Sequence, residues 1–256
     1  MKVLIALAVL SIFASAQKPE VTAESRPAPR GSLRVSISWV GDAPATRPAS
    51  IPKDWKARNP DDAKVCESCE TRGTLIDESL LVDPKSKGVE GIVVSLSQLV
   101  DGVQDLPAIP AKPVVRNEGC RFSPHIVLST PSDPLTVTNE DPFTHAISVA
   151  GLGGASLTSE VIQPKGKVEI GKLSARGIYV LTCPLHGWMR GYVVVLKQGA
   201  AGVTSRDGTT LLSGLATGRR TVSIWHETLG SKRVEVDVSV DKETVLSLTQ
   251  KDFPAR

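Results

Sequence analysis

Residues 181–191 of the 256-residue chain read LTCPLHGWMRG, which places a cysteine, a histidine and a methionine in the spacing Cys183-x2-His186-x2-Met189. Short apolar, β-branched segments lie directly on both sides, and this predicts a loop between two strands. Met189 is the only methionine after the first residue, so a general use of methionine as core filler does not account for its position. A shuffled chain of this composition would contain the same spacing only about 2 times in 10,000. We therefore interpret this loop as the chemical centre of the protein.

The three side chains of the loop are a thiolate, an imidazole and a thioether, which are soft or borderline ligands that suit copper. A trigonal set of two histidines and one cysteine with a weak axial methionine is a known copper arrangement, and it requires one more histidine. His145 opens the strand-like residues 146–150, where a neighbouring strand would present it beside the loop. The sequence thus predicts one mononuclear copper ion at His145, Cys183, His186 and Met189. The alternative is a buried cysteine, a surface histidine and a core methionine with no metal.

The rest of the chain is rich in short apolar segments bounded by glycine and proline. Residues 33–39 alternate between apolar and polar, as in a strand with one buried face. Similar segments are residues 91–99, 114–115, 126–128, 135–138, 146–150, 168–170, 178–182, 192–196, 221–225, 234–240 and 244–248. Such regularly spaced short strands indicate an all-β sandwich or barrel. No strong helical pattern is visible, so we expect helix only as short turns, and we expect residues 43–87 to form an ordered excursion held by cysteine.

The composition is that of a globular protein, with 41% hydrophobic and 22% charged residues. Only 4% of the residues are aromatic, so the core is built mainly from Val, Leu and Ile, which favours strands. The formal charge is +3 and no run of five or more basic residues occurs, which argues against nucleic acid as a partner. There is no recognisable Ser/His/Asp arrangement or paired-carboxylate motif, and four histidines are too few for a multinuclear copper site. We do not expect an enzyme.

The N-terminus has the pattern of a secretory signal. Lys2, an apolar run at residues 3–13 and the Ala14-Ser15-Ala16 ending predict a signal peptide at residues 1–16, cleaved before Gln17. Residues 17–30 are rich in proline and poor in apolar residues, and we interpret them as a flexible leader. No later stretch has the length of a membrane helix, so we expect no membrane insertion after cleavage. The mature chain is expected to be secreted or periplasmic.

Several segments of the middle region carry a likeness to a known family. These segments are Phe122-Ser-Pro124, residues 126–128, residues 135–139 followed by His145, Gln163-Pro-Lys-Gly166, and residues 177–183 leading into the loop. Together they resemble the cupredoxins, and in particular the amicyanin, pseudoazurin and plastocyanin type.

The resemblance implies a Greek-key sandwich at residues 112–197, with His145, Cys183 and His186 as equatorial copper ligands and Met189 as the axial one. It also implies one-electron transfer to a redox partner protein, because the fold holds the ligands in place while copper changes oxidation state. Family members commonly have asparagine directly after the first histidine. Ala146 stands there in this chain, so the surroundings of the ligands are altered.

The C-terminal part resembles a second family. Residues 202–227 are similar to a carboxypeptidase-regulatory or transthyretin-like β-sandwich, a family sometimes likened to carbohydrate-binding modules. The family's first strands are missing after Leu196, but residues 31–39 and 88–96 have the same character. We therefore expect either a sandwich split around an inserted copper domain or two tandem domains. The corresponding boundaries are residues 31–104 for the N-terminal strands and excursion and residues 198–251 for the C-terminal sandwich, and carbohydrate is a candidate ligand.

The remaining cysteines suggest a structural role. Cys66 and Cys69 form a C-x-x-C pair, but no histidine follows as in haem attachment and no βαβ pattern surrounds them as in thioredoxins. With Cys183 assigned to copper, we expect one disulfide from Cys120 to either Cys66 or Cys69, which would leave one thiol and tether the excursion to the copper domain. The alternative is a zinc site formed by the same three cysteines and His125.

Three other residues carry weaker signals. We expect His125 at a strand edge with its ring satisfied by hydrogen bonds. His226 is either a packed histidine at a domain interface or a contact for a second metal or a partner. Trp188 is expected to shield the copper ligands from water and to offer a docking surface, and the alternative is a role in packing alone. The alternatives to an electron carrier are a copper storage or delivery protein, and a polysaccharide-binding or adhesion module.

Overall fold

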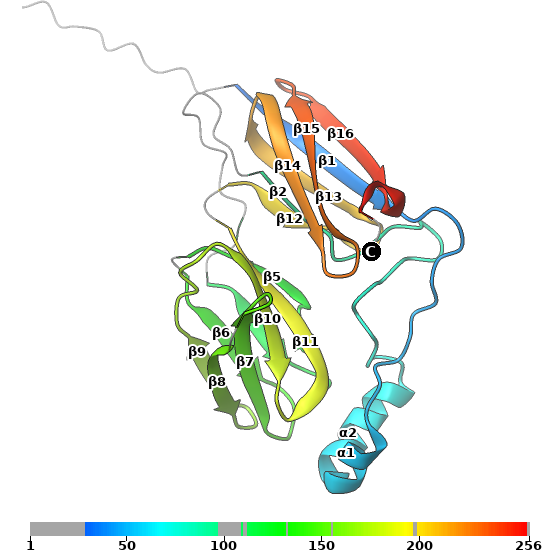
Figure 1. Ribbon diagram of the computed structural model, residues 1–256, viewed down its shortest axis with the longest axis vertical. Coiled ribbons are helices and arrows are strands. Elements are labelled where there is room, and N and C mark those ends of the chain that lie inside the picture. Colours follow the sequence, from blue (N-terminus) through cyan, green and yellow to red (C-terminus); the bar gives the residue numbers. More distant parts are fainter. Residues whose placement is uncertain are drawn as a thin grey trace, which may run out of the picture.

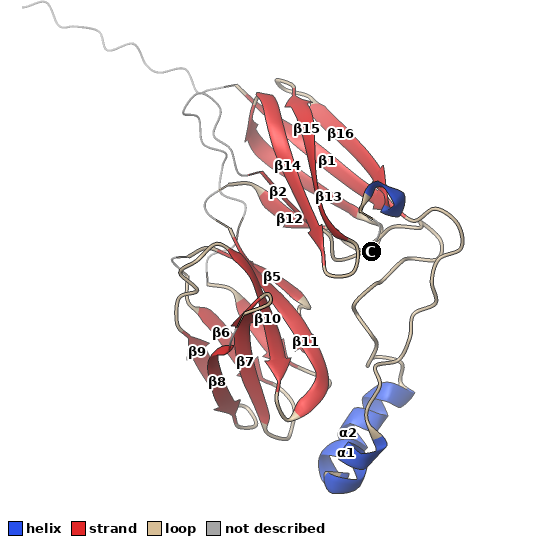
Figure 2. Ribbon diagram, in the orientation of Figure 1, coloured by secondary structure: helices blue, strands red, loops and turns tan. Residues whose placement is uncertain are grey.

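The computed structural model describes residues 29–96, 109, 112–131, 133–154, 156–196 and 199–254. The predicted signal peptide 1–16, nearly all of the predicted leader 17–30 and most of the proline-rich residues 106–113 lie outside the described residues. Two β-sandwiches and a helical segment make up the described chain (Figure 1). Strands fill both sandwiches, and the main helices form one hairpin to the side (Figure 2). The predicted all-β fold is confirmed.

The sandwich in the middle of the sequence, residues 112–196, is called the central sandwich below. Its five-stranded sheet has the order β5 (Ile126–Ser129), β11 (His186–Val195), β10 (Gly177–Cys183), β7 (His145–Gly151) and β8 (Ser156–Ile162). Its four-stranded sheet has the order β4 (Phe122–Ser123), β3 (Val114–Asn117), β6 (Leu135–Asn139) and β9 (Lys167–Ile170). β5 pairs with β11 and β3 pairs with β6 in parallel, whereas the other neighbours are antiparallel. The chain therefore crosses between the two sheets, as in a Greek-key sandwich.

The core of the central sandwich follows from the alternation of side chains along its strands. In β10, Tyr179, Leu181 and Cys183 are buried, and the residues between them are partly exposed. In β6, Leu135 and Val137 are buried in the same alternating pattern. Because side chains alternate between the two faces of a strand, Cys183 at the end of β10 lies on the same buried face as Tyr179 and Leu181. The alternation thus places the thiol of Cys183 inside the protein.

The second sandwich combines both ends of the described chain, and it is called the split sandwich below. One sheet has the order β13 (Thr209–Ala216), β1 (Arg30–Ser38) and β16 (Glu243–Thr249), and the other has the order β12 (Ala201–Val203), β2 (Val93–Leu96), β14 (Gly218–His226) and β15 (Gly230–Val238). The central sandwich is therefore inserted in the sequence between β2 and β12. Strands from before and after the central sandwich thus lie in the same sheets. The predicted domain boundaries stay predictions. The likeness of the split sandwich to transthyretin-like domains and its carbohydrate ligand stay predictions.

Residues 43–87 contain more helix than we predicted. They include α1 (Lys53–Arg58) and the 12-residue α2 (Pro60–Thr71), so the expectation of helix only as short turns is wrong here. α2 buries only Ala63, Cys66 and Cys69, and this narrow stripe leaves little hydrophobic periodicity for a sequence reading to detect. A short 3-10 helix, η1 (Gln250–Asp252), follows β16. Within the described ranges, no helix combines the length and the apolar character needed to cross a membrane.

The two sandwiches pack against each other through outer faces of their sheets. Val93 and Trp225 of the split sandwich form one buried hydrophobic cluster with Ile126, Tyr192 and Val194 of the central sandwich. The rings of Tyr192 and Trp225 meet edge to face, with their centroids 5.2 Å apart. Since aromatic and β-branched side chains fill this contact, burial of apolar surface holds the sandwiches together.

His125 connects three parts of the chain beside this contact. Its Nε2 contacts the carboxylate of Glu227 in the split sandwich, and its Nδ1 is 3.8 Å from a carboxylate oxygen of Glu78 in the excursion. Arg121 donates a 2.9 Å hydrogen bond to Glu78, and the Tyr192 hydroxyl donates one of 2.9 Å to Glu227. Burial lowers the pKa of His125, but the hydrogen bond and charge of Glu227 and the charge of Glu78 outweigh it and raise this pKa. The two carboxylates thus stabilise the charged form of the ring relative to an isolated histidine.

We expect His125→Gln to destabilise the protein more near pH 5.5 than near pH 9. A group whose pKa is raised on folding contributes stability that is complete below its unfolded pKa of about 6.5 and is lost as the pH rises through its folded pKa. Loss of a hydrogen bond to a charged partner corresponds to about 1.5 to 3 kcal/mol at the lower pH. Urea unfolding of both proteins at the two pH values measures the difference. An equal loss of stability at both would mean that folding does not raise the pKa of the ring.

Candidate metal centre

Neighbouring strands bring the cysteine and the two histidines of the predicted site together. β10 ends at Cys183, a two-residue turn follows, and β11 begins at His186. β7 begins at His145 and pairs antiparallel with β10. In an antiparallel pair the start of one strand lies beside the end of the other, so His145 arrives at the same end of the sheet as Cys183.

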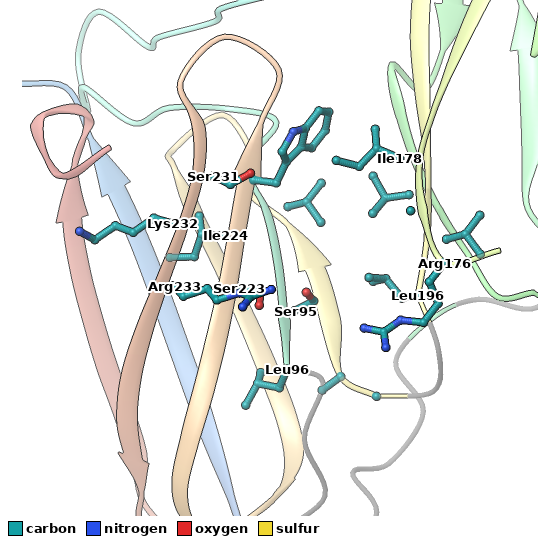
Figure 3. Close-up of a pocket in the computed structure, with 17 residues that line it drawn as sticks. Ser95, Leu96, Arg176, Ile178, Leu196, Ser223, Ile224, Ser231, Lys232 and Arg233 are labelled. Atoms are coloured by element: carbon teal, nitrogen blue, oxygen red, sulfur yellow. The ribbon is translucent and has the colours of Figure 1, made fainter. Parts of the chain in front are cut away.

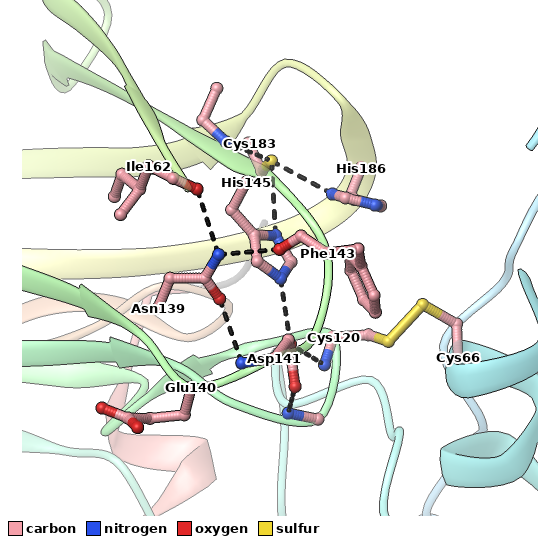
Figure 4. Close-up of polar contacts among 12 residues, drawn as sticks. Cys66, Cys120, Asn139, Glu140, Asp141, Phe143, His145, Ile162, Cys183 and His186 are labelled. Atoms are coloured by element: carbon pink, nitrogen blue, oxygen red, sulfur yellow. Dashed lines mark hydrogen bonds and ion pairs between the residues drawn. A yellow bond between two sulfur atoms is a disulfide. The ribbon is translucent and has the colours of Figure 1, made fainter. Parts of the chain in front are cut away.

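The donor atoms of these three residues converge in the interior of the protein (Figure 4). The Sγ of Cys183 is 3.9 Å from Nδ1 of His145 and 3.3 Å from Nδ1 of His186, and all three donors lie within 4.8 Å of one another. Donors held by one ion at about 2.0 to 2.3 Å are roughly 3.3 to 3.7 Å apart at tetrahedral or trigonal angles, so this arrangement fits a metal ion. Each of the three residues is at most 1% exposed.

Met189 lies on the same strand as His186 and is also in the interior. It is 2% exposed and belongs to the same buried cluster as Cys183. It also lines a cavity of about 550 Å³, which Trp188 and His125 border as well. The structure thus puts the thioether in the same buried core as Cys183, and its role as an axial ligand stays a prediction.

The surroundings of Cys183 favour its thiolate form. Burial raises the pKa of Cys183, but hydrogen bonds from His145, His186 and the backbone N–H of Ala146 outweigh it and lower the pKa to about 6. The Ala146 N–H lies 3.4 Å from Sγ. The thiolate is the form of cysteine that binds metals, so the site is prepared for an ion near neutral pH. Although Ala146 lacks the amide side chain common in the cupredoxins, its backbone still braces the sulfur.

Asp141 orients His145, and the sequence analysis missed it. The Nε2 of His145 donates a 2.9 Å hydrogen bond to Asp141, which leaves Nδ1 to face the sulfur. The same carboxylate accepts hydrogen bonds from the backbone N–H groups of Gly119 at 2.7 Å and Cys120 at 3.0 Å. Burial raises the pKa of Asp141, but these hydrogen bonds outweigh it and keep that pKa below its usual value. An acidic residue four positions before a candidate histidine ligand was the signal that could have identified it.

Aromatic rings enclose His186, and one of them comes from outside the central sandwich. Ring centroids of Phe143, Trp188 and Trp55 lie 5.3, 5.3 and 5.1 Å from that of His186. Trp55 belongs to α1, and its indole N–H donates a 2.7 Å hydrogen bond to the backbone oxygen of Leu185. The Nε2 of His186 is buried and has no hydrogen-bond partner among the described residues. The helical excursion therefore covers the outer side of the candidate metal centre, and no local sequence signal pointed to Trp55.

A disulfide attaches the helical segment to the central sandwich beside the candidate metal centre. Cys66 of α2 forms a disulfide with Cys120, and Cys69 is a buried free thiol. A disulfide between Cys120 and one of the two helix cysteines was predicted, and it is present. The alternative zinc site is not formed, because two of its four ligands are joined to each other. The disulfide connects α2 to Cys120, whose backbone N–H donates a hydrogen bond to Asp141 (Figure 4).

The other two residues singled out in the sequence lie in different places. Trp188 contacts the ring of His186, and its Nε1 donates a 3.1 Å hydrogen bond to the backbone oxygen of Cys120. Its shielding role stays a prediction. His226 is in the split sandwich, is 2% exposed, and accepts hydrogen bonds at Nδ1 from the N–H groups of Thr228 and Leu229. It is a packed histidine away from the metal centre. A docking role for either residue stays a prediction.

Comparison with known proteins gives matches among solved structures. No protein-family model and no curated protein matches the chain. Amicyanin from Paracoccus versutus is 19% identical, with a TM-score of 0.30, and covers 40% of this chain and 96% of its own. A purple cupredoxin from Nitrosopumilus maritimus is 21% identical, with a TM-score of 0.30, and covers 33% of this chain and 99% of its own. A copper-containing nitrite reductase from Thermus scotoductus is 21% identical, with a TM-score of 0.31; the match covers 39% of this chain and 25% of the reductase.

Proposed function

We propose that this chain is an exported, mononuclear copper protein of the cupredoxin type that carries one electron at a time. The observation that supports it is the convergence of two imidazole nitrogens and one thiol sulfur within 4.8 Å in a buried site. A thiolate with imidazoles is a donor set suited to copper, and Met189 would complete it as a weak axial ligand. Copper, when bound, supplies the exchange of one electron between its two common oxidation states.

The residues of the chain hold the donors in place. His145, Cys183 and His186 stand at strand ends, and the carboxylate of Asp141 fixes the ring of His145. Such partners set the orientation of ligands and tune the metal. Because strands and hydrogen bonds position the donors, they would keep their places in either oxidation state. Little rearrangement would accompany electron transfer.

The burial of the site favours a carrier over an enzyme. A catalytic metal keeps a position open for substrate or water. Here the four proposed ligands are each at most 2% exposed, and aromatic rings surround His186. The thiolate and imidazole donors would thus have little contact with solvent, and electron transfer does not require a substrate to reach the ion. A protein partner that approaches the covered side would suffice.

The test is to load the purified mature chain with one equivalent of copper(II) and to cycle it electrochemically. We expect a single reversible one-electron wave, no loss of metal on reduction, and electron self-exchange between the two forms that broadens NMR signals near the site. Loss of copper on each reduction would favour storage or delivery. A colourless complex without a reversible wave would rule out the electron carrier.

Export is tested separately. The predicted cleavage before Gln17 means that protein recovered from the medium or periplasm begins at this residue, which N-terminal sequencing can determine. An intact N-terminus on protein retained in the cytoplasm would contradict export.

We expect Trp55→Ala to speed the loss of copper from the loaded protein. The indole covers His186 from outside the central sandwich, so its removal opens the ring to water and chelators. Loss of a partner that surrounds a metal ligand typically weakens binding about 10-fold to 100-fold. Transfer of copper to an excess of a coloured chelator measures the rate. The matched control is Trp55→Phe, which retains a ring at this place and should release copper at nearly the original rate; a similar acceleration in both variants would contradict a covering role.

A further inference from the structure

A cavity of about 430 Å³ lies between the two sandwiches and is separate from the metal centre (Figure 3). One wall is formed by residues of β2, β14 and β15, and the other by residues of β10 and β11. None of the four proposed copper ligands lines it. Small-molecule sites typically measure about 300 to 1,000 Å³, favour domain interfaces, and combine apolar walls with a few placed polar groups. The cavity has this character.

Strand register determines which side chains of the split sandwich face the cavity. Ser95 of β2 is opposite Ser223 of β14, and Ser223 is opposite Arg233 of β15. Directly opposed residues of antiparallel strands share a face, so these three form one polar row across the sheet. Val93 and Trp225 form an apolar row on the same face. The wall therefore has a polar row beside a hydrophobic one.

The wall from the central sandwich repeats this combination. Ile178, Val194 and Leu196 supply its apolar part, and Arg176 precedes β10 at the rim. Figure 3 shows the guanidinium groups of Arg176 and Arg233 directed into the space from opposite walls. Two forked cations thus face each other across a largely apolar cavity.

The positive charge of the cavity has no acidic counterpart. Its lining residues include three basic residues, Arg176, Lys232 and Arg233, and no aspartate or glutamate. Within the described part of the chain, neither arginine forms an ion pair. Lys232 is opposite Ile224, on the other face of the sheet. The pKa of Asp252 is lowered mainly by hydrogen bonds from Thr249, and the charge of Lys232 lowers it further. The two arginines are therefore the cations available to a ligand in the cavity.

We propose that this cavity binds a small amphipathic carboxylate. The guanidinium groups of Arg176 and Arg233 would hold the carboxylate, since planar arginine forks match its geometry. The hydroxyls of Ser95 and Ser223 would add hydrogen bonds, and the apolar body would pack beside Trp225. The ligand would touch both sandwiches and so hold them together. This proposal does not depend on copper.

Titration calorimetry of the full mature chain, with and without copper, tests the proposal with decanoate as the probe. Decanol has the same apolar body without the charge, and inorganic phosphate has charge without the body. We expect one decanoate per chain with a dissociation constant below about 1 mM, and binding of decanol and phosphate that is at least about tenfold weaker. Bound decanoate should also raise the melting temperature.

Variants assign the binding to the two arginines. Arg176→Gln and Arg233→Gln should each weaken decanoate binding about 10-fold to 100-fold, the effect of losing a charge-assisted hydrogen bond. Lys232→Gln, one residue away on the opposite face, is the matched control and should bind as the original does. Ser223→Leu fills the cavity and should block decanoate binding. This variant provides the test if either arginine variant fails to fold. Equal binding of decanol, several decanoates per chain, or unchanged affinity in the folded arginine variants would overturn the proposal. Because the titrations are run without copper too, a failed electron-transfer test would leave this result standing.

Discussion

Cys183→Ser should abolish the intense visible absorption of the copper-loaded protein and weaken copper binding by more than about 100-fold. Cys183 provides the only sulfur anion of the donor cluster, with Nδ1 atoms of His145 and His186 at 3.9 and 3.3 Å. Loss of a group that merely supports a ligand already costs about 10-fold to 100-fold in affinity, and loss of the ligand itself should cost more. A serine hydroxyl is a hard donor that remains protonated near neutral pH, so it cannot replace the thiolate.

Cys69→Ser is the matched control for this prediction. Cys69 is the other free, buried cysteine of the described chain, and it lies in the hydrophobic cluster around α2. Absorption spectra recorded during copper titration of the two variants compare the thiols directly. Colour that survives in Cys183→Ser, or that disappears in Cys69→Ser, would mean that the metal is held elsewhere.

Cys120→Ser should lower the free energy of unfolding by about 4 kcal/mol and loosen the cover of the metal centre. The disulfide closes a loop with a sequence separation of 54 residues, for which the chain-entropy relation gives about 4 kcal/mol at 25 °C. We substitute Cys120 rather than Cys66, because in a Cys66 variant the free thiol of Cys69 could bond to Cys120 instead. Cys69 lies one helical turn from Cys66. Serine at position 120 prevents either bond.

Urea unfolding measures the loss of stability, and copper transfer to a chelator measures the loosening of the cover. We expect the copper of Cys120→Ser to become as accessible as that of Trp55→Ala, because the same segment carries Trp55 over His186. Reduction of the original protein under conditions that spare bound copper should reproduce both effects. Unchanged stability in Cys120→Ser would show that packing of α2 alone holds the excursion.

The donor cluster could be anticipated because its signals are local. Cys183, His186 and Met189 fall within seven residues, and the alternation of β10 assigns Cys183 to the interior. His145 required one further step, the pairing of strands at one end of a sheet. By contrast, α2 has only a narrow stripe of buried residues, so its helical state was missed.

The absence of a local sequence signal also explains why Asp141, Trp55 and β8 were not predicted. Asp141 lies in a turn whose carboxylate points to His145 only once Gly119 and Cys120 are brought beside it. Trp55 precedes the loop by 130 positions and reaches Leu185 only through the folding of the excursion. β8 was not predicted because nearly all its side chains are exposed at a sheet edge, which removes the apolar alternation that identifies strands.

The amino-acid sequence alone determined the strand-rich class, the identity of the proposed ligands and the involvement of Cys120 in a disulfide, because spacing and alternation are properties of short segments. The tertiary structure decided which helix cysteine pairs with Cys120, that β1 and β2 join strands from the C-terminal part, and that α1 closes over His186. It also decided that two arginines face each other between the sandwiches. These features depend on contacts between residues far apart in the chain, and such contacts form only when burial of the whole core fixes the segments relative to one another.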